Sequence, residues 1–214
     1  MTLYAITIFA SAFLLFLVQP IIAKQILPWF GGSAAVWTTC MVFFQMTLLA
    51  GYAYTDLTTR KLAPRRQATL HAALLGMSLL TLPIMPDLSW KPAGDENPSW
   101  RILGLLGVTI GLPYFLLSTT SPLLQAWFVR RFAHAIPYRL FALSNLASLL
   151  ALLAYPVMIE PWVSTGAQSI AWSVCYGFFV LLCGGAAIAG MRGEAAARPD
   201  QAAQIGRASC RERV

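Results

Sequence analysis

The chain has 214 residues, of which 58% are hydrophobic and 11% are charged. A soluble domain of this length carries roughly one quarter charged residues, so the composition excludes an ordinary soluble domain and indicates a protein of the membrane. The net charge of +7 is carried by short loops between apolar segments, a distribution that argues against nucleic acid and for the lipid bilayer as a partner.

Six apolar runs follow one another along the chain, at residues 3–23, 34–54, 69–85, 102–127, 140–159 and 168–191. Each has roughly 20 residues, enough for a helix to cross a hydrocarbon core about 30 Å thick. Helices are the expected form, because lipid offers no other partner to backbone N–H and C=O groups. We therefore predict an all-α integral membrane domain over residues 1–192, with six transmembrane helices that are kinked at their internal prolines.

Arginine and lysine are distributed unevenly between the loops on the two sides of these spans. One set of loops carries Arg60, Lys61, Arg65, Arg66, Arg130, Arg131, Arg139, Arg192 and Arg198. The opposite loops carry Lys24, Lys91, Arg101, Asp87, Asp95, Glu96 and Glu160. The positive-inside rule assigns the first set to the cytoplasm, which predicts that both termini are cytoplasmic.

The first span contains polar residues where lipid makes them costly. Gln19 precedes Pro20, and Lys24 and Gln25 follow one turn later. Polar groups inside membranes are candidates for functional sites, which makes Gln19 and Lys24 candidate substrate-binding residues. Lys24 has a plainer alternative, because its amine can reach water at the external end of the helix. Glu160, also a candidate, ends the fifth span on the same side, so the topology allows an ion pair between Lys24 and Glu160 that would form an external gate.

The fourth span carries four consecutive hydroxyl side chains between two prolines: Ser118, Thr119, Thr120 and Ser121. Each proline removes an N–H and frees a carbonyl, near Thr109 or Ser118, which hydroxyl groups can satisfy. In this interpretation the cluster repairs a kinked helix and packs it against its neighbours. In the alternative, the prolines mark a discontinuous helix whose open backbone lines a polar cavity, and the four hydroxyl groups are candidates for binding substrate.

Asn145 in the fifth span is the remaining candidate substrate-binding residue, because an amide in lipid needs hydrogen-bond partners. Contact between helices is its alternative role, and Gln45 of the second span has the same two interpretations. His71, near the start of the third span, is interpreted as interfacial rather than as a proton relay. With no CxxC motif and no pair of histidines at ligand spacing, the sequence predicts neither a metal site nor a cofactor.

The C-terminal residues differ in composition from the spans. Residues 193–204 are Ala-rich and polar with one proline, which is typical of a linker, and we expect this linker to be cytoplasmic. The last ten residues, IGRASCRERV (205–214), resemble the translation of a short-read sequencing adapter. We therefore expect residues 205–214 to be non-native and the natural chain to continue beyond residue 204.

Three stretches together resemble a known family: LFLVQPIIAKQILPWFGGSAAVWTTCMVFFQ (15–45), GLPYFLLSTTSPLLQAWF (111–128) and PYRLFALSNLASLLALLAYPVMIEP (137–161). They are similar to the N-terminal membrane region of the bacterial fused major-facilitator/spermidine synthase proteins. The resemblance implies a multi-pass protein of the bacterial inner membrane. In that family further spans follow, and many members end in a soluble domain similar to aminopropyltransferases. These residues contain no Gly-rich loop for a nucleoside cofactor and no acidic pair in a soluble pocket, so the family's catalysis is not carried over to them, and whether the full protein is an enzyme stays open.

Two functional interpretations remain. In the first, the chain is a module that binds or moves a small solute along a path lined by the first, fourth and fifth spans. A polyamine or related amine is suggested by the family name alone. In the second, the chain is a membrane anchor or scaffold for a downstream aminopropyltransferase-like catalytic domain. The missing partner would be a C-terminal membrane region, a soluble domain, or both. No internal repeat, which would favour transport, is evident in the sequence.

Overall fold

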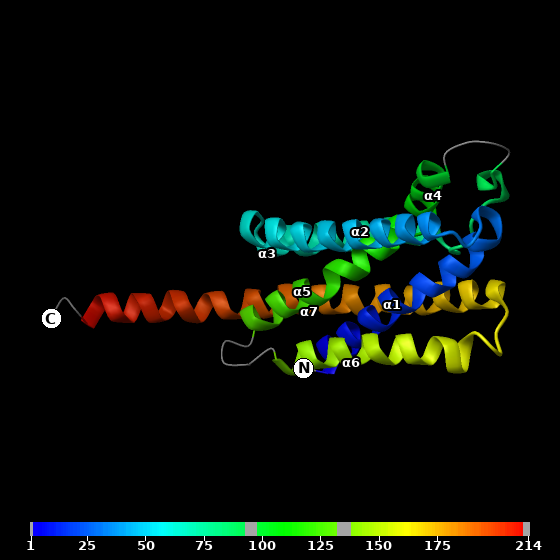
Figure 1. Cartoon of the computed structure of the whole chain (residues 1–214). Helices are drawn as coiled ribbons and strands as arrows, with labels where there is room; N and C mark the ends of the chain where they lie inside the picture. The colour runs from blue at the N-terminus through cyan, green and yellow to red at the C-terminus, as the bar shows by residue number, and fades with distance from the viewer. Residues whose placement is uncertain (1, 93–97, 132–137, 212–214) are drawn as a thin grey trace.

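The computed structural model describes the backbone of residues 2–92, 98–131 and 138–211 and the side chains of residues 2–92, 98–130 and 138–189. This part of the chain is helical and contains no strand. Its α-helices are α1 (Thr2–Phe30), α2 (Ala34–Lys61), α3 (Pro64–Ser78), α4 (Pro98–Leu106), α5 (Leu112–Arg131), α6 (Tyr138–Ala154) and α7 (Thr165–Arg211) (Figure 1). The prediction of an all-α protein is confirmed for the described residues.

Five helical segments are long and apolar enough to cross a membrane: Thr2–Phe30, Ala34–Lys61, Pro98–Arg130, Tyr138–Ile159 and Thr165–Ala189. They correspond to five of the six predicted spans, so the chain has the character of a multi-pass membrane protein. The predicted span 69–85 instead coincides with α3 and the 3-10 turn η1 (Leu79–Thr81). Its α-helix has only 15 residues, about 23 Å in length, which is shorter than a hydrocarbon core. The helical path ends there because Leu82, which precedes Pro83, is extended, as residues before proline prefer.

Two of the spans contain a π-helical turn beside a proline. The turn η3 (Gly107–Gly111) joins α4 to α5 just before Pro113, and the turn η4 (Tyr155–Ile159) extends α6. Proline lacks an N–H and crowds the carbonyl four residues back, and a wider turn relieves both effects. Figure 1 shows α4 and α5 pointing in different directions, so the predicted kink is present. The helical path still runs without interruption from Pro98 to Arg130. The alternative of a discontinuous fourth helix is therefore wrong.

Helix α1 lies at the centre of the bundle, packed against α5, α6 and α7 (Figure 1). Its apolar residues cover all sides, as expected of a helix surrounded by protein, and Ile8, Val18, Ile22 and Ile26 are completely buried. On one side of it α2 packs against α4 and α5, and α3 packs against α7. These contacts bring together α1, α5 and α6, the three spans predicted to line a solute path.

The contacts made by helices α1, α2 and α3 resemble those made by α5, α6 and α7. When α1 is matched with α5, α2 with α6 and α3 with α7, the contact of α1 with α6 corresponds to that of α5 with α2. The contact of α1 with α7 corresponds likewise to that of α5 with α3. Exchanging the matched helices leaves two further contacts unchanged, that of α1 with α5 and that of α3 with α7. The structure therefore has a repeated packing pattern that the sequence does not reveal.

The last helix continues well past its apolar part. α7 runs through Arg211 and so includes residues 193–204, predicted to be a linker, and much of the segment 205–214. Only a helical backbone is described for these two segments, so their cytoplasmic location and the non-native origin of the tail stay predictions.

Candidate functional site: polar contacts between the helices

The ion pair between Lys24 and Glu160 that the sequence allowed is present. Lys24 Nζ, on the C-terminal half of α1, lies 3.2 Å from Oε1 of Glu160, which directly follows η4. The two side chains are 37% and 44% exposed, so water screens their attraction and the pair is worth less than about 1 kcal/mol. One residue further along α1, the Gln25 amide donates to the hydroxyl of Ser169 in α7. Polar side chains thus tie α1 to two other elements at this end of the bundle.

We expect the Lys24–Glu160 pair to show a small coupling free energy. In a double-mutant cycle with Lys24→Met and Glu160→Gln, measured as the free energy of unfolding in mixed micelles, the coupling should be below about 1 kcal/mol and should fall as salt is added. The exposed pair of Arg60 with Asp56, at 2.7 Å on α2, is the matched control and should behave similarly. A coupling free energy well above about 1 kcal/mol, or one that added salt leaves unchanged, would contradict this prediction.

Gln19 uses its amide between helices. Its Nε2 donates to Tyr114 Oη of α5 at 3.1 Å, and Tyr114 is buried. One residue later on α1, the carbonyl of Pro20 lies 3.5 Å from the hydroxyl of Tyr155 in η4. The polar residues around Pro20 therefore face α5 and the end of α6 rather than lipid. This position agrees with a role in helix contact, and substrate binding by Gln19 stays a prediction.

The hydroxyl cluster mostly satisfies its own helix. Ser118 donates to the carbonyl of Phe115 at 2.6 Å, and Thr119 and Thr120 each donate to that of Leu116 at 2.7 Å. These acceptors differ from the predicted carbonyls of Thr109 and Ser118. A hydroxyl on a helix reaches back only three or four residues, so Thr109 is out of range and only Ser121 is placed to reach the carbonyl of Ser118. Ser121 instead reaches another helix. Its hydroxyl lies 3.4 Å from that of Ser144 in α6.

At the same cluster α2 and α5 approach each other closely. A Cβ atom added to Gly51 would lie 1.9 Å from Ser118 Oγ and 3.3 Å from the backbone nitrogen of Thr119. One turn later, Thr55 Oγ1 lies 3.4 Å from the Thr119 carbonyl. Our sequence analysis missed Gly51, although the spacing of Gly51 and Thr55 is the small-xxx-small pattern that allows membrane helices to approach closely.

Gln67 organises a second polar cluster that the sequence analysis also missed. It is completely buried, and its Nε2 donates to the hydroxyls of Thr58 and Thr59 at 3.1 and 2.9 Å. Its Oε1 accepts from Trp127 Nε1 at 3.1 Å and from Arg130 at 3.2 Å. These contacts tie together the end of α2, the start of α3 and the end of α5, at the end of the bundle opposite to the C-terminal end of α1 (Figure 1). The sequence held one signal for this cluster, because Gln67 directly follows the basic residues Arg65 and Arg66.

His71 lies inside the helix bundle. Its side chain is completely buried, and its Nε2 lies 3.8 Å from Cys183 Sγ of α7. The centroid of its ring is 6.2 Å from the ring centroid of Tyr54 and also 6.2 Å from that of Trp127. The side chain is buried because α3 packs on α7 and α5, so this face of α3 meets protein. The position of His71 relative to the membrane interface stays a prediction. Among the described residues, no three His, Cys, Asp or Glu side chains are grouped so that they could hold a metal ion.

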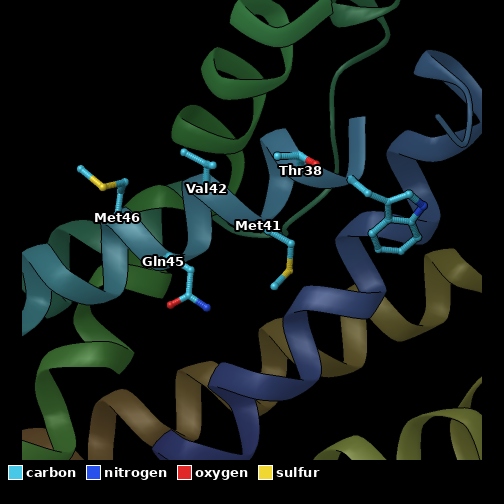
Figure 2. Close-up of a pocket in the computed structure, with 6 residues that line it drawn as sticks. Thr38, Met41, Val42, Gln45 and Met46 are labelled. Carbon is cyan, nitrogen blue, oxygen red and sulfur yellow. The ribbon is translucent and has the colours of Figure 1, made fainter. Parts of the chain in front are cut away.

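The remaining candidate, Asn145, lies apart from the contacts that join α1, α5 and α6. Its side chain is exposed on α6, although its neighbour Ser144 contacts Ser121. A groove of about 380 Å³ lies on the face of α2 and is lined by Trp37, Thr38, Met41, Val42, Gln45 and Met46 (Figure 2). Gln45 lines this groove, but Gln19, Lys24, Asn145, Glu160 and the Ser118–Ser121 cluster do not. The structure therefore places four of the eight candidates, Gln19, Lys24, Ser121 and Glu160, in pairwise contacts between elements, and it does not gather the candidates around one cavity.

The apolar spans and the polar contacts between them define a helical multi-pass membrane protein. Comparison with models of known protein families, with curated proteins and with solved structures finds no significant match to this chain. The relation to the fused major-facilitator/spermidine synthase proteins therefore stays a prediction that rests on the three quoted stretches.

Proposed function

We propose that the chain is a membrane module that binds or moves a small solute, with α1, α5 and α6 lining the path. The observation that carries this proposal is a series of polar contacts among these elements: Gln19 with Tyr114, Ser121 with Ser144, and Lys24 with Glu160. Apolar helices need no such groups in order to pack. Polar side chains retained inside membrane spans commonly mark the pathway of a solute or an ion.

The repeated packing pattern supports transport over anchoring. Many secondary transporters are built from repeats, with the substrate site near the interface between the repeats. In this chain the matched helices α1 and α5 contact one another. Each of them also carries a proline that follows a polar residue, as Gln19–Pro20 in α1 and Ser121–Pro122 in α5. A membrane anchor needs neither feature.

The charge distribution supports an orientation. Basic residues gather at the Gln67 end of the bundle. Arg130 hydrogen bonds to Gln67, and four more lie within seven residues of Gln67 in the sequence: Arg60, Lys61, Arg65 and Arg66. The Lys24–Glu160 pair lies near the opposite end, close to the C-terminal ends of α1 and η4. By the positive-inside rule the Gln67 end is cytoplasmic. Both termini are then inside only if α3, too short to cross as a helix alone, returns the chain to the external side together with the residues that follow it, and we propose this arrangement. With the family resemblance, this orientation leads us to propose the bacterial inner membrane as the location.

We propose a small amine as the solute. The carboxylate of Glu160 is 44% exposed and already pairs with the amine of Lys24. An amine entering from the external side would compete with Lys24 for this carboxylate and so open the contact between α1 and η4. The choice of a polyamine in particular rests on the family resemblance.

The test is uptake of radiolabelled putrescine and spermidine by liposomes that contain the purified chain. We expect saturable uptake above that of empty liposomes, reduced at least about tenfold by Glu160→Gln, because a neutral amide cannot attract an ammonium group as a carboxylate does. Asp56→Asn is the matched control, since it removes an exposed carboxylate from α2 and should leave uptake unchanged.

The possible outcomes distinguish the two functional interpretations. Uptake that depends on Glu160 supports the transport proposal. If neither amine enters, although both variants and the unmodified chain insert and fold equally, the proposal fails and a membrane anchor is the better interpretation.

A further inference from the structure

Two amide side chains in the spans differ from all the other described ones. Those of Gln19, Gln25, Gln67, Gln125 and Gln168 each donate a hydrogen bond to another residue. Gln45 of α2 and Asn145 of α6 are exposed and hydrogen bond to no described residue. The fold thus gives each of the five amides at least one hydrogen bond through its N–H groups, whereas the two exposed amides make none to the described residues.

Lipid cannot satisfy an outward amide. Gln45 lies near the middle of α2, a helix of 28 residues, so the headgroups and water are about two to three turns away in either direction. A primary amide has two N–H donors and a carbonyl acceptor, and burying them without partners costs free energy. A hydrogen-bonding partner from another membrane helix removes this cost.

The residues around Gln45 form a stripe suited to a helix. Thr38, Gln45 and Tyr52 are seven residues apart, and residues seven apart lie within about 20° of one another on a helix. Met41 and Leu49 fill the spaces between them and are 48% and 60% exposed. Figure 2 shows Met41 and Gln45 projecting to the same side of α2. A repeat of seven residues with apolar residues between is typical of the contact line between two helices that cross at a small angle.

We propose that this stripe, Thr38 to Tyr52 on α2, is the interface with a second copy of the chain. In a parallel pair of α2 helices related by a two-fold axis, each residue of the seam lies opposite its own copy. An amide is complementary to itself, because each copy of Gln45 can donate one N–H and accept one. The groove of about 380 Å³ beside Gln45 offers space for the apolar side chains of the facing helix. Self-pairing therefore needs no residue beyond those already present.

The test is self-association of the purified chain in lipid vesicles, measured by energy transfer between donor-labelled and acceptor-labelled copies as lipid is added. We expect association that Gln45→Leu weakens about fivefold to tenfold, the effect of one or two hydrogen bonds between membrane helices. Gln45→Asn keeps an amide and should retain most of the association. Asn145→Leu is the matched control, because it removes the other exposed amide from a helix outside the stripe.

A second measurement locates the interface. In a variant whose cysteines are replaced by alanine, Met41→Cys should form a disulfide between copies under mild oxidation, and Ala50→Cys, which lies on another side of α2, should not. The proposal is overturned if the unmodified chain stays monomeric at all lipid ratios, which would assign the stripe to a different protein or segment. It is overturned equally if Gln45→Leu associates as strongly as the unmodified chain, or if the two cysteine positions cross-link equally.

Discussion

Replacing Gly51 by leucine should abolish the packing of α2 on α5 and unfold much of the bundle. Even a single Cβ at this position would lie 1.9 Å from Ser118 Oγ, 3.0 Å from Ser118 Cβ and 3.3 Å from the backbone nitrogen of Thr119. The hydroxyl could rotate away, but the backbone of α5 could not do so without separating the helices. Overpacking of this kind typically costs about 1–3 kcal/mol for small additions, so we expect this cost for Gly51→Ala and a larger one for Gly51→Leu.

The measurement is the free energy of unfolding in mixed micelles, with Gly177 as the matched control. Gly177 lies in the apolar part of α7, where an added Cβ meets no atom within 4 Å, so Gly177→Ala should be neutral or stabilising through helix propensity. Ser118→Ala should partly rescue Gly51→Ala, because it removes the nearest clashing atom. Equal effects of alanine at the two glycines would show that α2 and α5 do not approach as closely as the structure indicates.

Replacing Gln67 by leucine should be the most damaging polar substitution in the described chain. It removes the acceptor of Trp127 Nε1 and of Arg130, and the donor to Thr58 and Thr59, all at a completely buried position. A buried donor left without an acceptor costs about 1–3 kcal/mol. With more than one group affected, we expect a loss of about 3 kcal/mol in the free energy of unfolding.

Gln125→Leu provides the comparison for Gln67. Gln125 is only partly buried and donates a single hydrogen bond, to Ser121 of its own helix, so its loss should cost less than about 1 kcal/mol. Fluorescence of the tryptophans should also report a change around Trp127 in the Gln67 variant alone. Equal losses of stability for the two glutamine variants would contradict the role assigned to the Gln67 cluster.

Much of the architecture could be read from residue order. Continuous apolar runs mark five of the observed spans because a helix in lipid has to satisfy its own backbone, whatever its neighbours are. The π-helical turns beside Pro113 and at Pro156 follow from the covalent structure of proline in the same way. The short third helix was also encoded locally, in Pro83 and Pro86, but the apolar residues around them concealed it.

The pairing of polar residues was predictable only where topology constrained it. Lys24 and Glu160 end their spans on the same side, so the predicted topology was enough to suggest their contact. The hydrogen bonds of the Ser118–Ser121 cluster were misassigned, because the direction in which a hydroxyl reaches along its own helix was not considered.

The sequence by itself determined that this is an all-helical membrane protein, where most of its helices lie and which of them bend, since these properties depend on each segment and its solvent. Only the tertiary structure decided which polar residues are enclosed inside the bundle. Gln67 and His71 are buried, whereas Gln45 and Asn145 are exposed. Every span is apolar on nearly all sides, so hydrophobicity along the chain does not distinguish the side that faces protein from the side that faces lipid. That distinction arises from contacts between segments far apart in the chain, such as Gly51 with Ser118.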